Sequence, residues 1–142
     1  MGDVQSIMST PIVTVELDDT LFVVKDIFEN VNFHHVLAVE DGVLKGVLSD
    51  RDLLKAISPY VGTVAETTRD IETLKKKVHQ VMSRNPVCLK KEAEISDAVS
   101  IFKTYSFSCI PIVDDESRPI GIVTWRDIIG NNSTNKLCLK RF

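Results

Sequence analysis

The sequence predicts two copies of one small unit, in which the order of elements is strand, helix, strand, strand, helix. Two observations support this prediction. The same motifs occur twice in the same order, and the same succession of β-branched runs and helical stripes lies between them. A chain of 142 residues has room for one compact domain or two very small ones, which suits a duplicated unit.

The repeated motifs lie at the start and at the end of each copy. Residues 4–11 (VQSIMSTP) resemble residues 78–86 (VHQVMSRNP), and residues 46–54 (GVLSDRDLL) resemble residues 121–129 (GIVTWRDII). An ordered series of matches of this kind does not arise by chance. The predicted division is a first copy at 1–57, a connector at 58–77, a second copy at 78–130 and a polar C-terminal tail at 131–142.

The first copy opens with a β-branched run, typical of a strand, and continues with apolar residues at helical spacing after a capping threonine. Two more apolar runs flank Glu40-Asp41-Gly42, which is typical of a tight turn, and a short helix follows. The predicted elements are a strand at 12–15, a helix at 21–31, strands at 36–39 and 43–48, and a helix at 50–57. The second copy repeats the order, with strands at 87–89, 110–113 and 120–124 and helices at 95–105 and 125–129.

The connector is predicted to contain one helix over residues 64–80 rather than a flexible linker. Thr63 and Glu66 have the spacing of a capping box, and apolar residues recur at intervals of three and four from Val64 to Val81. A helix packed on the body would fix how the two copies face each other. Any site between the copies would then be preformed.

The composition excludes several classes of function. Apolar residues make up 44% of the chain and charged residues 26%, as in ordinary globular domains. With 17 basic and 20 acidic residues the net charge is −3, and no basic cluster is present that could bind nucleic-acid phosphates. The apolar runs are far shorter than the roughly twenty residues that cross a membrane, and no secretory signal is recognised. Three cysteines without CxxC spacing predict free thiols in a reducing cytoplasm.

No pattern predicts catalysis or metal binding. The sequence lacks P-loop, dinucleotide-binding and hydrolase motifs, and no nucleophile and base have a spacing that suggests a catalytic set. His34 and His35 are adjacent, and neighbours on a strand point to opposite faces, so the two rings cannot easily chelate one ion. We therefore expect neither an enzyme nor a metal site.

The duplicated motifs Met-Ser-x-(x)-Pro and Gly-h-h-[Ser/Thr]-x-x-Asp, in which h is apolar, resemble those of the cystathionine β-synthase (CBS) domain. The resemblance covers residues 4–57 and 78–130, so the chain is similar to a tandem CBS pair, or Bateman module, of the stand-alone bacterial kind. It implies an α+β fold in which two units related by a pseudo-two-fold axis leave clefts between them. It also implies binding of an adenosyl compound in these clefts and the pairing of two modules into a flat disc.

By this resemblance, Asp52 and Asp127 accept hydrogen bonds from the ribose hydroxyls of the ligand. A carboxylate has the two acceptor oxygens that this role requires. The alternative is structural, because Ser49 with Asp52, and Thr124 with Asp127, have the spacing of a capping box. Ser49 and Thr124 also lie where backbone N–H groups open a helix, which suits phosphate oxygens.

Positive charge and an adenine slot complete the predicted site. Arg51 and Arg126 would attract phosphate; the alternative is a surface arginine paired with a local acid. One histidine of His34-His35 is a further candidate for phosphate. By the resemblance, strand-entry segments form the adenine slot through backbone groups and apolar side chains, with core packing as the alternative for each apolar residue. These segments are residues 9–12 and 32–36 in the first copy and residues 83–87 and 107–111 in the second. The candidate binding residues within them are Thr10, Pro11, Ile12, His34, His35 and Val36, and Arg84, Asn85, Pro86, Val87, Ser108, Cys109, Ile110 and Pro111.

The site around Asp127 is expected to be the more important for nucleotide affinity. Arg84 and Asn85, at the strand entry of the same copy, would supply charge and donors, whereas Asp50 places a second negative charge beside Asp52.

The leading hypothesis is a regulatory module that binds AMP, ADP or ATP, with S-adenosylmethionine or NAD(H) as secondary candidates. Ligand binding in the cleft between the units would change the shape of the module, and an effector protein would respond. The alternative is a structural or dimerisation module without a bound nucleotide. The apolar pairs Leu53-Leu54 and Ile128-Ile129 predict a homodimer. No nucleic-acid or membrane partner is expected, and the expected location is cytoplasmic.

Overall fold

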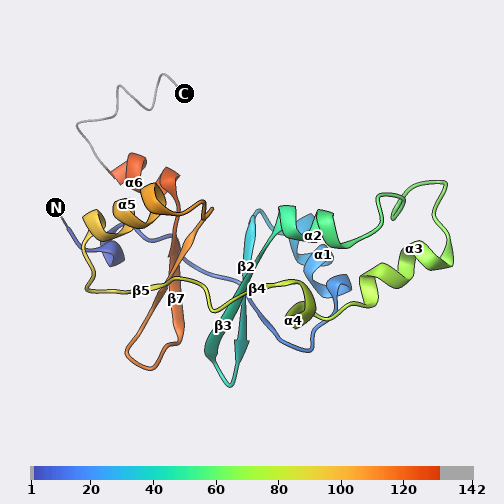
Figure 1. Cartoon of the computed structure of the whole chain (residues 1–142), viewed down its shortest axis with the longest axis horizontal. Coiled ribbons are helices and arrows are strands. Elements are labelled where there is room, and N and C mark those ends of the chain that lie inside the picture. The colour runs from blue at the N-terminus through green and yellow to red at the C-terminus, as the bar shows by residue number, and fades with distance from the viewer. Residues whose placement is uncertain (1, 132–142) are drawn as a thin grey trace. The chain divides into compact units, whose positions relative to one another are not determined.

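The computed structural model describes residues 2–131 of the chain, which form two compact units (Figure 1). The continuous unit is Val13–Pro86, and the split unit combines residues 2–12 with residues 87–131. These units do not coincide with the two sequence copies. Residues 2–12 fold with the second copy, and residues 78–86 fold with the first.

The continuous unit is built on a four-stranded sheet with the order β1-β2-β3-β4, in which β1 and β2 are parallel and the other neighbours antiparallel. Its strands are β1 (Thr14–Glu16), β2 (His35–Glu40), β3 (Val43–Ser49) and β4 (Ser83–Arg84). Its helices are α1 (Leu21–Asn30), α2 (Asp50–Ala56), α3 (Thr68–Glu72), the 3-10 helix η2 (Thr73–Lys75) and α4 (Val78–Val81). Leu21, Val36 and Leu48 are fully buried in a core that these helices and strands share.

The split unit has a three-stranded sheet with the order β5-β6-β7, in which β5 and β6 are parallel and β7 is antiparallel to β6. Its strands are β5 (Leu89–Lys90), β6 (Ile110–Val113) and β7 (Pro119–Val123), and its helices are the 3-10 helix η1 (Val4–Ser6), α5 (Ile95–Thr104) and α6 (Trp125–Asn131). Val4 and Ile7 contribute to its core beside Ile110 and Val123. Both copies therefore have the predicted order of elements, and the α+β class is confirmed.

The opening segments of the two copies occupy equivalent places in the two units. In the continuous unit β4 extends the sheet beyond β3, with Ser83 opposite Val47. In the split unit Ser9 forms an antiparallel bridge with Ile122 of β7. Each segment thus borders the closing strand of the other copy, an exchange that local sequence patterns do not indicate.

The turn between β2 and β3 forms where the sequence predicts it. Asp41 and Gly42 have positive φ angles of 53° and 81°, the backbone conformation of tight two-residue hairpins. Glycine adopts this conformation without the steric cost of a Cβ. Two strands start later than predicted. The strands expected at 12–15 and 87–89 correspond to β1 and β5, and Ile12 and Val87 lie outside them.

The prediction of one helix over residues 64–80 is wrong. The backbone becomes extended at Lys76 and Lys77, with ψ angles of 147° and 151°, and separates η2 from α4. Pairing with the residues around the start of α1 stabilises this break. Leu21 N donates to Lys76 O at 2.9 Å, and Val78 N donates to Asp19 O at 2.8 Å. These long-range bonds replace helical ones, which is why apolar periodicity alone is misleading here.

The start of the connector also differs from the prediction. The capping box is formed by Thr67 and Asp70 at the start of α3, whereas Glu66 Oε1 accepts from Gly62 N at 2.8 Å. Val64 is fully exposed, so the apolar stripe does not extend to it. Only the second half of the stripe is buried, through Leu74 and Val78.

Candidate functional site

Asp127 lies at the first turn of α6, and four hydrogen bonds surround it. Its Oδ2 accepts from Thr124 N at 2.9 Å and from Thr124 Oγ1 at 3.2 Å, and its own amide donates to Thr124 Oγ1 at 3.4 Å. The fourth bond comes from the other end of the sequence, since Ser9 Oγ donates to Asp127 Oδ1 at 2.7 Å. The capping geometry considered for this motif is therefore present. The sequence analysis placed Ser9 in a strand-entry segment of the first copy and missed its contact with Asp127 of the second.

Asp52 has the equivalent position at the first turn of α2. Its Oδ2 accepts from Ser49 N at 3.0 Å, and its amide donates to Ser49 Oγ at 3.0 Å, which completes a capping box. Both aspartates remain partly exposed. Capping uses one carboxylate oxygen of each residue, so it does not by itself prevent a second role.

The two histidines beside Asp52 have different environments. His34 Nδ1 lies 2.9 Å from Asp50 Oδ2; the His34 side chain is largely exposed and that of Asp50 about half exposed. His35 is half-buried, and burial lowers its pKa below the usual value, although the nearby Asp50 carboxylate opposes the shift. The Asp50 carboxylate, whose negative charge we expected to weaken phosphate binding, is thus in hydrogen-bonding contact with the His34 ring.

The structure corrects the grouping of the strand-entry segments. Thr10 and Pro11 follow Ser9 and belong to the split unit with Asp127, not to the unit that contains Asp52. Arg84 and Asn85 belong to the continuous unit, where Arg84 Nη2 donates to His79 O at 2.8 Å and Asn85 N donates to Lys45 O at 3.2 Å. Ranking Asp127 above Asp52 because Arg84 and Asn85 share its copy is therefore unsupported.

Several residues assigned to the adenine slot have side chains in the cores. Val36 and Ile110 are fully buried among apolar neighbours, and Cys109 and Pro111 are buried too. Their side chains are not on an open surface, so core packing, the alternative weighed for each apolar residue, accounts for them. The more accessible members of the predicted set are Thr10, Pro11, Ile12, His34, His35, Arg84, Asn85, Pro86, Val87 and Ser108.

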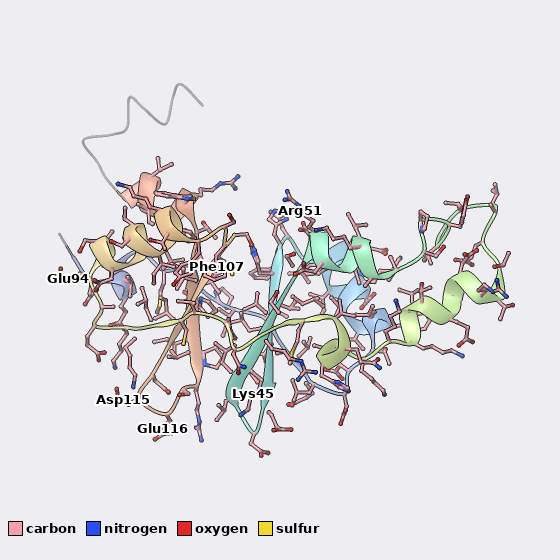
Figure 2. The ribbon with its side chains drawn as sticks, viewed as in Figure 1. Lys45, Arg51, Glu94, Phe107, Asp115 and Glu116 are labelled. Atoms are coloured by element: carbon pink, nitrogen blue, oxygen red, sulfur yellow. The ribbon has the colours of Figure 1, made fainter. Side chains whose placement is uncertain are left out.

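Positive charge is exposed near each aspartate. Arg51 lies at the start of α2 (Figure 2), and Arg126 lies in the first turn of α6. Beside Arg126, the Trp125 ring packs against Phe102 of α5 with 5.2 Å between ring centroids. Trp125 therefore has a structural partner, while two-fifths of its surface remains exposed.

A cavity of about 440 Å³ lies in the continuous unit between α1 and the connector. Phe22, Ile71 and Leu74 are among its apolar lining residues, and Asp26, Glu29 and Glu66 are among its charged ones. None of its lining residues belongs to the predicted site.

Residues 2–131 contain neither a candidate metal site nor a candidate membrane-spanning helix. This part of the chain contains no group of three or more His, Cys, Asp or Glu side chains that could hold a metal ion. None of its helices has the length and apolar character needed to cross a membrane.

The geometry defines a class of protein, a duplicated β-α-β-β-α chain with a capped aspartate after the last strand of each copy. The CBS domain family model matches residues 4–59 and 78–132, and the chain belongs to this family. It is 32% identical over 130 residues to a CBS domain-containing protein of Dictyostelium discoideum, with 89% of this chain and 88% of that protein covered. It is 31% identical over 119 residues to inosine-5′-monophosphate dehydrogenase of Methanocaldococcus jannaschii, but the match spans 83% of this chain and only 21% of that enzyme.

Solved CBS pairs have the same fold. The CBS domain pair of protein MJ0100, in complex with 5′-methylthioadenosine and S-adenosyl-L-methionine, superposes with a TM-score of 0.71. It is 26% identical, and the match covers 89% of this chain and 95% of that one. The structure of CBSX2 in complex with AMP has a TM-score of 0.75 at 21% identity, with 99% and 100% of the chains covered.

Proposed function

We propose that this chain is a non-enzymatic regulatory CBS pair that binds an adenosyl compound and signals its presence to an effector protein. The main observation behind the proposal is the duplicated, partly exposed aspartate at a helix start, Asp52 and Asp127, with an exposed arginine next to each. The adenosyl ligands of the MJ0100 CBS pair support the choice of ligand class.

AMP, ADP or ATP is the proposed ligand, with S-adenosylmethionine or NAD(H) as secondary candidates. Arg51 and Arg126 offer charge-assisted hydrogen bonds to phosphate oxygens, which methylthioadenosine and S-adenosylmethionine lack. The ribose hydroxyls are common to all these compounds, so the aspartates would recognise the class and the arginines the phosphate.

A structural role without nucleotide is the second candidate. The Ser49–Asp52 and Thr124–Asp127 capping boxes, together with the Ser9–Asp127 bond, give both aspartates a purpose in the absence of ligand. On this alternative the aspartates stabilise helix starts and nothing else.

A thermal-shift screen with AMP, ATP, NADH and S-adenosylmethionine, followed by calorimetry, separates the two candidates. A ligand that binds only the folded state stabilises it by about 2.7 kcal/mol at a hundredfold excess over its Kd, so the melting temperature rises. GMP and inosine monophosphate serve as controls for the adenine ring. A panel in which no adenosyl compound shifts the melting temperature or releases heat would favour the structural module.

We also propose a homodimer and a cytoplasmic location. Of the apolar pairs considered for the interface, Leu53 is buried in its own core and is not available, whereas Leu54 is 71% exposed on α2. Ile128 and Ile129 are partly buried. The unbonded cysteines Cys88 and Cys109 support the reducing location.

A further inference from the structure

Ser9 is held beside Asp127 through its backbone. Its amide donates to Ile122 O at 2.7 Å, and its carbonyl accepts from Ile122 N at 3.2 Å. The preceding residue, Met8, packs on Gly121, where an added Cβ would overlap the methionine sulfur. With the backbone fixed in this way, the exposed hydroxyl reaches Asp127 Oδ1 at 2.7 Å.

The equivalent bond is missing from the continuous unit. Ser83 is the residue of the continuous unit that is equivalent to Ser9. It lies opposite Val47 of β3, just as Ser9 lies opposite Ile122 of β7. Asp52 has the place of Asp127. Within the described residues no hydrogen bond joins Ser83 to Asp52, whose carboxylate accepts from Ser49 N. The two copies therefore differ at the aspartate carboxylate. Asp127 accepts a hydrogen bond from the serine of the opening motif, and within residues 2–131 Asp52 does not.

We propose that the Ser9 hydroxyl competes with the ribose of the ligand for Asp127 and so weakens the site of the split unit. The inference rests on the proposed function, in which Asp127 accepts ribose hydroxyls. Thr124 donates twice to Oδ2 and Ser9 donates once to Oδ1, so both carboxylate oxygens of Asp127 already accept hydrogen bonds. A carboxylate has about four lone-pair sites, and these three bonds use three of them, so a ribose diol that donates two hydrogen bonds must displace one. The Ser9 bond is the one that does not belong to the helix cap.

The competition sets the order of the two sites. Each ligand bound at Asp127 exchanges one hydroxyl–carboxylate bond for another, whereas a ligand at Asp52 displaces no equivalent serine. The Asp52 site is thus the tighter one, opposite to the order that the sequence suggests. The Ser9 bond is open to solvent, so its effect on affinity lies in the lower part of the range for hydrogen bonds, about two- to fivefold.

The test measures AMP binding by calorimetry in the full-length chain carrying Asp52→Asn, which leaves Asp127 as the remaining aspartate site. In this background Ser9→Ala is expected to tighten AMP binding about two- to fivefold. Ser9→Thr keeps the hydroxyl and is expected to bind like the chain with Ser9. Ser83→Ala is the matched control, because it removes the repeat-equivalent hydroxyl and is expected to leave the affinity unchanged.

Adding Asp127→Ala tests whether Ser9 acts on affinity through the Asp127 carboxylate. Without its acceptor the Ser9 hydroxyl has nothing to block, so Ser9→Ala is expected to have no further effect, a non-additivity that a general change in stability would not produce. Unchanged or weaker binding in Ser9→Ala, with the parent still binding AMP, would overturn the competition and leave the proposed function intact. If neither the parent nor any Ser9 variant binds AMP or S-adenosylmethionine, the proposed function fails and the competition fails with it.

Discussion

Met8 packs on Gly121, and Met82 packs on Gly46 in the same way. At both glycines the methionine sulfur fills the space that a Cβ would need. Each contact joins the opening motif of one copy to the closing motif of the other, although the two motifs lie far apart in the sequence. The repeated methionine and glycine therefore belong to one packing arrangement that occurs once in each unit.

This arrangement predicts that Gly46→Ala destabilises the protein more than Gly121→Ala. A Cβ at Gly46 would also lie 2.9 Å from the carbonyl oxygen of Ser83, a backbone atom that cannot turn away, whereas the nearest atoms at Gly121 all belong to the flexible Met8 side chain. We expect Gly46→Ala to lower the free energy of unfolding by about 1–3 kcal/mol, measured by urea denaturation. Gly130→Ala is the control, since nothing lies near that Cβ and alanine favours the helix. Equal losses at Gly46 and Gly121 would contradict the packing argument.

Alanine at Asp52 or Asp127 distinguishes a cap from a ligand contact. Loss of a cap lowers stability by about 1 kcal/mol with or without ligand. Loss of two charge-assisted hydrogen bonds to ribose lowers affinity by well over tenfold, at about 1.5–3 kcal/mol each. We expect Asp52→Ala to reduce AMP affinity more than Asp127→Ala, because Ser9 already occupies Asp127. Calorimetry that finds both variants binding like the parent, with only their melting temperatures lowered, would identify the aspartates as caps.

The half-buried His35 predicts a loss of stability in mild acid. Burial lowers its pKa in the folded protein, while the Asp50 carboxylate opposes the shift, His34 adds to it and Asp52 opposes it. The unfolded chain therefore binds more protons than the folded one, and the free energy of unfolding falls as the pH drops through about 6.5. Urea denaturation at pH 7.5 and 5.5 measures this difference. His35→Gln is expected to remove most of this difference, and His34→Gln, which removes only the smaller contribution of His34 to the shift, to reduce it less. The same pH dependence in both variants would refute the assignment.

The cysteines are expected to differ in reactivity. Burial raises the pKa of Cys109 to about 12, so roughly one thiol in ten thousand is ionised at pH 8. Cys88 is exposed, and its pKa is raised by partial burial while Lys90 lowers it. A thiol reagent should label Cys88 well before Cys109, with Cys88→Ala as the control that removes the faster site.

All 3 cysteines are expected to be free thiols, including Cys138, which lies outside the described residues. Thiol titration of denatured protein should therefore count 3 thiols. Fewer thiols in fresh, reductant-free protein would argue against the cytoplasmic proposal.

The proposed dimer predicts a mass of about twice 15.9 kDa by light scattering at micromolar concentration. Leu54→Lys places a charge on an exposed apolar residue of α2 and should shift the protein to the monomer mass. Val64→Lys adds the same charge at a fully exposed connector residue and should leave the dimer intact. A monomeric parent would rule out the dimer, and a dimeric Leu54→Lys would place its interface elsewhere.

Local features of the chain were predictable because they depend on neighbouring residues. The apolar spacing in α1, the β-branched strand β6 and the Asp41-Gly42 turn each express a preference of a short stretch of backbone, and each forms close to its predicted position. The duplication itself is also visible in sequence, and with it the family. The capping spacing of Ser49 with Asp52 likewise predicted a bond that the structure contains.

The tertiary structure alone decided what depends on residues far apart in the chain. Lys76 pairs with Leu21 and interrupts a helix that its own periodicity favours, because long-range backbone bonds replace the local ones. Which copy receives an opening segment is likewise visible only in the tertiary structure, where each methionine packs on the glycine of the other copy. Ser9 reaches Asp127 only through this exchange. The spacing of residues within one copy could not predict this contact, because its two partners come from opposite ends of the sequence.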